Sequence, residues 1–131
     1  MKFHEKLNLL LQITRVSGIT LARGAGVDPS LVFEAIKGGL AGSAVMNAKV
    51  PMMLAGNFTP GFKLELHIKD LNNALETGHN TGSPLPLTAV VMEMMQTLRA
   101  DGCGLDDHSA LAKFYAKLSG TAIGNSGREG D

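Results

Sequence analysis

One stripe of apolar residues constrains the fold of this chain more than any other feature. Between residues 64 and 75 the apolar side chains recur at intervals of four, three and four positions, as Leu64, Ile68, Leu71 and Leu75. This spacing places them on one face of a helix that reaches about His79, with polar side chains on the opposite face. No segment shows the alternation of apolar and polar residues that is typical of a strand. The pattern therefore predicts an all-α fold.

Start and stop signals predict three helices before this stripe. The first covers about residues 3–23, where apolar residues fall loosely at helical spacing. Asp28 followed by Pro29 begins the second, because the carboxylate can accept a hydrogen bond from a free N–H and proline loses nothing at the first helical position. The third runs from Ser43 to residue 54, and Pro51 inside it is expected to kink it or end it early.

The second half of the chain carries similar signals. Pro86 is suited to the first turn of a helix that ends before Gly102, and Asp107 can cap a last helix through the N–H groups near Ser109. Residues 120–131 are polar and rich in glycine, which predicts a disordered tail with nothing to bury. We therefore expect a single helical domain over residues 1–119, with the long first helix followed by about five shorter ones.

Length and charge exclude several classes of function. A chain of 131 residues has the size of one domain. Its 12 basic and 12 acidic residues cancel, so no summed positive field draws it to nucleic acid or to anionic membranes. Its single cysteine cannot form an internal disulfide, and no apolar run approaches the roughly 20 residues that span a bilayer. We expect a cytoplasmic protein that binds neither nucleic acid nor membranes.

Chemical motifs that stand on residue spacing alone are few. The glycines of residues 38–42 follow a predicted helix, as a helix end and tight turn would, rather than a strand as in a nucleotide-binding loop. His67 and Asp70 lie three positions apart, but no third ligand stands at a supporting spacing, so we expect no metal site. Cys103 has no adjacent basic residue and is predicted to be inert. An unrelated enzyme built on His67, Asp70 and His79 is the least favoured alternative.

A longer run carries a family resemblance. The segment NFTPGFKLELHIKDLNNAL, residues 57–75, resembles the hallmark stretch of the β-hydroxyacid dehydrogenase family, and within it most closely the branch that reduces tartronate semialdehyde. The likeness covers about residues 19–118 in order, and further matching segments are GGLAGS at 38–43, LPLTA at 85–89, MEMM at 92–95 and DHSAL at 107–111. The resemblance implies a helical bundle like the C-terminal domain of 6-phosphogluconate dehydrogenase-like enzymes, with the Rossmann domain absent.

The resemblance also implies roles for individual residues. Taken alone, Lys69 beside Asp70 is typical of a solvated helix face. By the match, however, Lys69 takes the place of the family lysine that reaches the cofactor, NAD or NADP, which this chain alone is not expected to bind. The catalytic lysine of the family falls at Met1 and its partner asparagine at His4, so no catalytic residue is assigned. Lys2, or Lys6 together with Asn8, could replace the family's catalytic residues only if the register of the first helix differed from that of the family.

Two functions follow as expectations. The first is a helical substrate-side and oligomerisation domain of an NAD(P)-dependent reductase of that branch. We expect this domain to be inactive on its own, to hold no metal, and to form a homodimer through its helical faces. The alternative is a stand-alone helical module for self-association or protein interaction. This alternative is motivated by an excess of methionine and leucine over what a small core needs.

Overall fold

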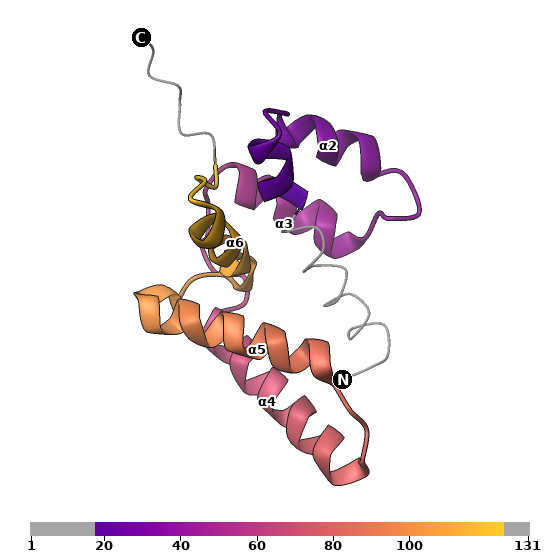
Figure 1. Ribbon diagram of the computed structural model, residues 1–131, viewed down its shortest axis with the longest axis vertical. Helices are drawn as coiled ribbons and strands as arrows, with labels where there is room; N and C mark the ends of the chain where they lie inside the picture. The colour runs from indigo at the N-terminus through magenta and orange to yellow at the C-terminus, as the bar shows by residue number, and fades with distance from the viewer. Residues whose placement is uncertain (1–17, 125–131) are drawn as a thin grey trace.

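The computed structural model describes residues 18–124, and within that range every regular element is a helix or helical turn (Figure 1). The only sheet-like contact in this range is an isolated antiparallel bridge between Lys63 and Asp107. A short helix at residues 18–24 comes first. The named elements that follow are α2 (Pro29–Ile36), α3 (Ala44–Leu54), α4 (Leu64–Thr81), α5 (Pro86–Leu98), a π-helical turn (Arg99–Cys103), a 3-10 turn (His108–Leu111) and α6 (Ala112–Ser119).

The helices form two groups joined by α6. In Figure 1, α4 and α5 lie side by side as an antiparallel pair, whereas the helix at 18–24, α2 and α3 gather at the other end of the molecule. Residues 1–17 lie outside the described range, so most of the predicted first helix is not tested. No helix among the described residues has both the length and the apolarity needed to cross a bilayer.

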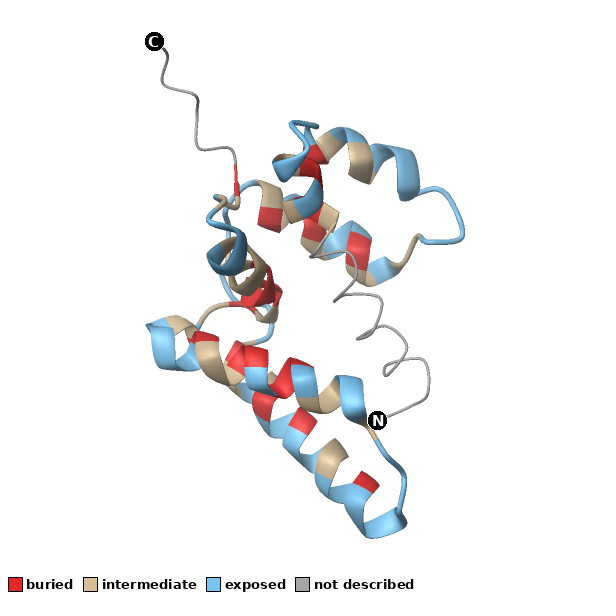
Figure 2. Ribbon diagram, in the orientation of Figure 1, coloured by how far each residue is buried: buried red, intermediate tan, exposed pale blue. Residues whose placement is uncertain are grey.

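The larger core lies between α4 and α5 (Figure 2). The predicted stripe on α4 is confirmed, since Leu64, Ile68 and Leu71 are buried and Leu75 packs partly against them. Five of the seven methionines are buried, three of them in this core and two in the smaller one. Methionine commonly fills irregular gaps in a core in this way. The full set of buried residues in this core is Leu64, Ile68, Leu71, Val91, Met92, Met94, Met95, Leu98, Ala110 and Leu111.

A smaller core lies at the other end, beneath α3. Its buried members are Ile19, Met46, Val50, Met53 and Ala112. Residues 120–131 are predicted to form a tail with nothing to bury. The described part of this stretch differs, because Ile123 packs against this cluster and Gly124 lies close to Gly56. A single isoleucine among polar neighbours gives no periodic signal, so this contact could not be predicted from the sequence.

Side-chain caps begin two of the helices, and the cap by Asp28 is the one that the sequence predicted. Asp28 accepts a hydrogen bond from the Ser30 N–H at 2.9 Å, and Ser43 accepts one from the Met46 N–H at 3.0 Å. The predicted end of α3 at residue 54 is confirmed, so of the two effects expected of Pro51, a kink or an early end, the early end does not occur. Burial of Val50 and Met53 on either side of Pro51 offsets the loss of one backbone donor.

Two glycines have roles that the sequence pattern did not show. Gly102 has a φ of 90°, so the chain leaves α5 through the π-helical turn by a left-handed residue that favours glycine. Gly78 lies buried within α4, where a β-carbon would sit 2.8 Å from the Ser83 carbonyl oxygen and 2.9 Å from Leu85. The turn between α4 and α5 therefore closes onto a position where any side chain would collide.

Candidate functional site

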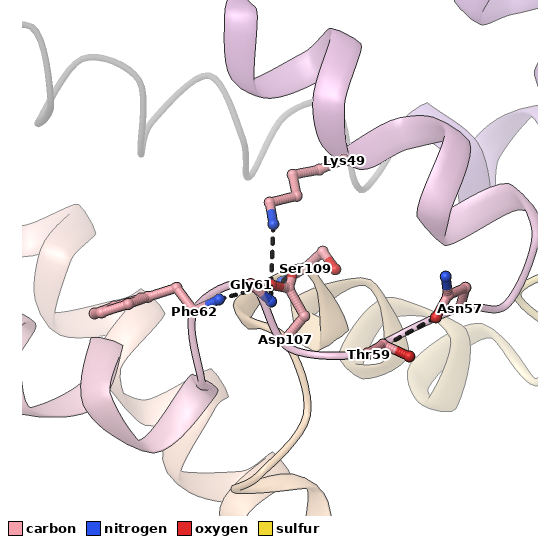
Figure 3. Close-up of polar contacts among 7 residues, drawn as sticks. All are labelled: Lys49, Asn57, Thr59, Gly61, Phe62, Asp107 and Ser109. Carbon is pink, nitrogen blue, oxygen red and sulfur yellow. Dashed lines mark hydrogen bonds and ion pairs between the residues drawn. The ribbon is translucent and has the colours of Figure 1, made fainter.

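A buried carboxylate organises the junction between α3, α4 and the 3-10 turn (Figure 3). Oδ1 of Asp107 accepts hydrogen bonds from the Lys49 ammonium at 2.9 Å, the Gly61 N–H at 3.0 Å and the Phe62 N–H at 3.1 Å. Its Oδ2 accepts one from the Ser109 N–H at 3.0 Å. Asp107 has no solvent-exposed surface. Four donors from three separate segments thus converge on one carboxylate.

The charge of Asp107 is maintained by these donors. Burial alone would raise the pKa of this carboxyl, but the hydrogen bonds from Ser109, Lys49 and Phe62 outweigh burial and hold its pKa well below the ordinary value of 3.8. The predicted capping of the last helical segment through Ser109 is confirmed. The contacts to Lys49, Gly61 and Phe62 were missed, because no sequence pattern links residues so far apart along the chain.

Backbone hydrogen bonds fasten the same two segments together. The Leu64 N–H donates to the Asp106 carbonyl at 2.8 Å, and the His108 N–H donates to the Phe62 carbonyl at 2.8 Å. The Glu65 N–H, a free donor of the first turn of α4, reaches the Gly104 carbonyl at 3.0 Å. The start of α4 is therefore held by segment 104–109 and has no side-chain cap of its own.

Three aromatic rings cover this anchored end of α4. The imidazoles of His67 and His108 stack with centroids 5.3 Å apart, and the Phe62 ring meets each of them edge-on. Burial lowers the pKa of His67 to about 4, assisted by the neighbouring His108 and opposed by Asp70 and Asp107. Burial also lowers the pKa of His108. Both imidazoles are therefore neutral near pH 7.

Lys69 lies on the solvent side of α4, opposite the buried stripe, and is exposed. Its ammonium makes no ion pair or hydrogen bond with any residue that the structure describes. The partly exposed side chain of Leu66 precedes it by three positions on the same helix face. This surface therefore presents one available cation on a helix whose first turn is rigidly anchored, which fits an anionic ligand.

The other residues considered from the sequence do not converge on a site. His79 is exposed in the last turn of α4 and stands about 18 Å along the helix from His67. Among the described residues, no group of three or more His, Cys, Asp or Glu side chains is arranged to hold a metal ion. Met1 and His4, the positions matched to the catalytic pair, lie outside the described residues.

Cys103 has a basic neighbour that the sequence did not reveal. The Lys113 ammonium from α6 lies 4.0 Å from its sulfur, but that ammonium also pairs with Asp106 at 2.7 Å. Burial raises the pKa of the Cys103 thiol and outweighs the lysine. A thiol with a raised pKa carries little thiolate near neutral pH, which agrees with the prediction that Cys103 is inert.

Comparisons with known proteins give a consistent family. A family model described as NAD-binding of NADP-dependent 3-hydroxyisobutyrate dehydrogenase matches residues 7–115. The chain is 38% identical to 2-hydroxy-3-oxopropionate reductase of Escherichia coli strain K12, over 86% of this chain and 39% of that protein. It is 33% identical to 2-(hydroxymethyl)glutarate dehydrogenase of Eubacterium barkeri, over 88% and 40%. The chain thus spans about two fifths of the length of these relatives.

A solved structure supports the fold. The crystal structure of 3-hydroxyisobutyrate dehydrogenase from Salmonella typhimurium matches with a TM-score of 0.77, over 84% of this chain and 39% of that one. The sequence identity is 23%, so this likeness concerns the fold alone.

One part of the predicted fold class is wrong. The prediction placed NAD binding in a Rossmann domain absent from this chain, whereas the matching model described as NAD-binding covers residues 7–115 of the chain itself. The prediction relied on the lack of a glycine-rich loop between a strand and a helix. That motif is one way to hold a dinucleotide. A helical segment that lacks it can therefore still take part in binding the cofactor.

Proposed function

The chain belongs to the family described as NAD-binding of NADP-dependent 3-hydroxyisobutyrate dehydrogenase, and on that premise we propose that it is a helical substrate-side and oligomerisation domain of an NAD(P)-dependent reductase. The identity to the E. coli enzyme supports 2-hydroxy-3-oxopropionate, also called tartronate semialdehyde, as the substrate. In such an enzyme the nicotinamide cofactor supplies the hydride. The helical chain supplies a wall of the cleft and a contact to the cofactor.

The observation that carries this proposal is the exposed, unpaired ammonium of Lys69. A phosphate-bearing dinucleotide requires cations that are not already neutralised by carboxylates. Of the other described lysines near the anchored end of α4, Lys49 and Lys113 pair with Asp107 and Asp106. Lys63 immediately precedes the helix and has no ion pair with a described residue, but it is only half-exposed, whereas Lys69 is exposed. Lys69 is therefore the cation that we assign to the cofactor, with the Asp107 junction fixing the helix that carries it.

We further propose that the chain alone does not turn over substrate. Reduction of a carbonyl requires a proton donor at the oxygen as the hydride arrives, and loss of general acid catalysis typically costs about 10²–10⁴-fold. The positions matched to the family's catalytic lysine and asparagine carry Met1 and His4, and the thioether side chain of a methionine has no acidic proton to donate. A single lysine contact also gives weak retention of a dinucleotide, on the order of millimolar.

Chemical-shift mapping tests the cofactor contact, because it detects millimolar binding. On addition of NADPH or NADH to the full chain, we expect amide shifts around Leu66, Lys69 and Asn73. Lys69→Met should abolish these shifts. The matched control is Lys37→Met, which removes an exposed lysine that pairs with Glu34 on α2 and should leave them unchanged. Unperturbed α4 signals at several millimolar NADPH and NADH would contradict the assignment.

An assay of NAD(P)H oxidation with tartronate semialdehyde tests the proposal that the chain alone does not turn over substrate. We expect no turnover above the background without protein. Robust reduction by the purified chain would show that a general acid is present and that the inactive-domain proposal is wrong.

A stand-alone self-association module is a second candidate, favoured by exposed leucines at the end of the molecule farthest from α4. Leu21, Leu31 and Leu40 are each more than half exposed, and Pro29 is the only buried residue of α2. Large exposed apolar side chains are typical of an interface when they form one patch. Sedimentation equilibrium should show a homodimer, and a monomer at high concentration would count against both the dimer and the module.

A further inference from the structure

The stacked pair of His67 and His108 joins two elements that are distant in sequence. His67 lies in the first turn of α4, and His108 begins the 3-10 turn that precedes α6. Their rings are nearly parallel, with an interplanar angle of 20°, and Phe62 closes the cluster with centroid distances of 6.0 Å and 6.2 Å. The contact therefore forms part of the junction that anchors α4.

This cluster has no acceptor ready for an additional proton. Nε2 of His67 and Nδ1 of His108 are both buried without a hydrogen-bond partner. An imidazolium carries two N–H donors, and burying a charge without partners is costly. Protonation of either ring would also place a positive charge against the face of the other.

The surrounding charges do not supply the missing acceptor. Asp70 on α4 and Asp107 beside the 3-10 turn favour protonation of His67. Asp107 also favours protonation of His108, which Lys49 on α3 opposes. Asp107 is already engaged by four donors, one of them the Lys49 ammonium. Burial exceeds these contributions, so the pKa values of both histidines lie below 6.5.

We propose that His67 and His108 form a proton-sensitive latch, which holds the start of α4 against segment 104–111 while both rings are neutral and releases it when one is protonated. Release separates the stacked rings and breaks the hydrogen bonds from His108 to Phe62 and from Leu64 to Asp106 that close the same junction. The latch is a property of this fold and does not depend on the proposed enzymatic role.

The pH range of release follows from the direction of the shift. The closed junction disfavours protonation, so the open form binds a proton more tightly and gains population as the pH falls below 6.5. The gain is up to about tenfold per pH unit for each imidazole protonated. For His67 this gain in the population of the open form ends near pH 4, where the closed form also becomes protonated. Asp107 titrates below this range, so the two effects are separable.

NMR titration of the full chain from pH 7.5 to 4 tests the latch. We expect the ring signal of His67 to titrate near pH 4. The amide signals of Phe62, Leu64 and His108 should change as the junction opens. The buried Met95 amide in α5 should remain unaffected over this range.

Two variants separate the latch from general acid unfolding. His67→Phe keeps a ring in the stack but cannot take a proton, so the junction signals should lose most of their dependence on pH between 6.5 and 4. His79→Phe is the matched control and should behave as the unaltered chain. Titration of His67 near 6.5 without change at the junction would overturn the proposal. An equal pH dependence of the junction amide signals in the unaltered chain and in His67→Phe would overturn it as well. If His67→Phe does not fold, the titration of the unaltered chain alone tests the latch.

Discussion

The Lys49 ammonium on α3 lies 2.9 Å from the Asp107 carboxylate, and 58 positions of sequence separate the two residues. Lys49 keeps 17% of its side-chain surface exposed, whereas Asp107 is fully enclosed. The pair therefore joins the α3 end of the molecule to the junction where α4 begins. A charge-assisted contact of this kind combines an ion pair with the backbone hydrogen bonds that share the same oxygen.

Asp107→Asn is expected to lower the free energy of unfolding by about 2–4 kcal/mol, because it leaves the Lys49 ammonium without its partner and weakens three backbone hydrogen bonds. Urea denaturation followed by circular dichroism measures the change. The control is the adjacent Asp106→Asn, which breaks an ion pair to Lys113 whose two side chains are each about one third exposed. That change should cost less than about 1 kcal/mol, and equal losses in the two variants would contradict a special role for Asp107.

Acid should destabilise the chain through Asp107 in a range lower than that of the histidines. The folded state holds the pKa of this carboxyl well below 3.8, so its contribution is fully present above that pH and is lost as the pH falls below it. Denaturation midpoints measured from pH 5 to pH 2 should drop steeply for the unaltered chain and less steeply for Asp107→Asn. Parallel pH profiles would show that other carboxylates govern acid unfolding.

Gly78→Ala should destabilise the chain by about 1–3 kcal/mol, although alanine is the better helix former. The added methyl group would meet the Ser83 carbonyl oxygen at 2.8 Å, and a backbone atom cannot move aside cheaply. Gly24→Ala is the matched control, because nothing lies within 4 Å of its new β-carbon. Thermal denaturation should show opposite signs, with Gly24→Ala neutral or stabilising by up to about 1 kcal/mol.

Gly78 illustrates which parts of the fold the sequence could predict. Local signals such as the stripe from Leu64 to Leu71 and the Asp28 cap depend on neighbours within a few residues, and the structure agrees with them. The need for glycine at position 78 arises from the loop that folds back after α4. Contacts of that kind are set by tertiary packing and leave no periodic trace.

The candidate site shows the same division. Capping by Asp107 could be predicted, since Ser109 lies two positions away, but the partnership with Lys49 could not. The stacking of His67 on His108 also requires two segments to meet. Lys69 was selected by resemblance, and its role stays a prediction. Its exposure and lack of a partner give that prediction a physical basis.

Leu71→Ala should lower the free energy of unfolding by about 2–5 kcal/mol, because Leu71 is fully enclosed between α4 and α5 and its removal leaves a cavity. Leu87→Ala is the control on α5. More than half of Leu87 is exposed, so its loss should cost less than about 1 kcal/mol. Chemical denaturation of both variants checks the assignment, and a large loss for Leu87→Ala would indicate that its surface is covered in solution.

Ile123→Ser should cost about 1–2 kcal/mol, because it removes an apolar side chain from the cluster beneath α3. Thr121→Ser is a control in the same stretch of chain, because the Thr121 hydroxyl contacts the Ser119 hydroxyl and serine keeps that hydrogen bond. Proteolysis by a nonspecific protease, followed by mass spectrometry, should cut after position 120 earlier in Ile123→Ser than in Thr121→Ser. Equal cleavage would mean that Ile123 does not hold this stretch.

Phe58 and Tyr115 each pack against both apolar clusters, one from the connector before α4 and the other from α6. A side chain shared in this way loses contacts on both sides when either cluster comes apart. The two ends of the molecule are therefore coupled during unfolding, and the described helices should melt in a single cooperative transition in which calorimetric and van't Hoff enthalpies agree.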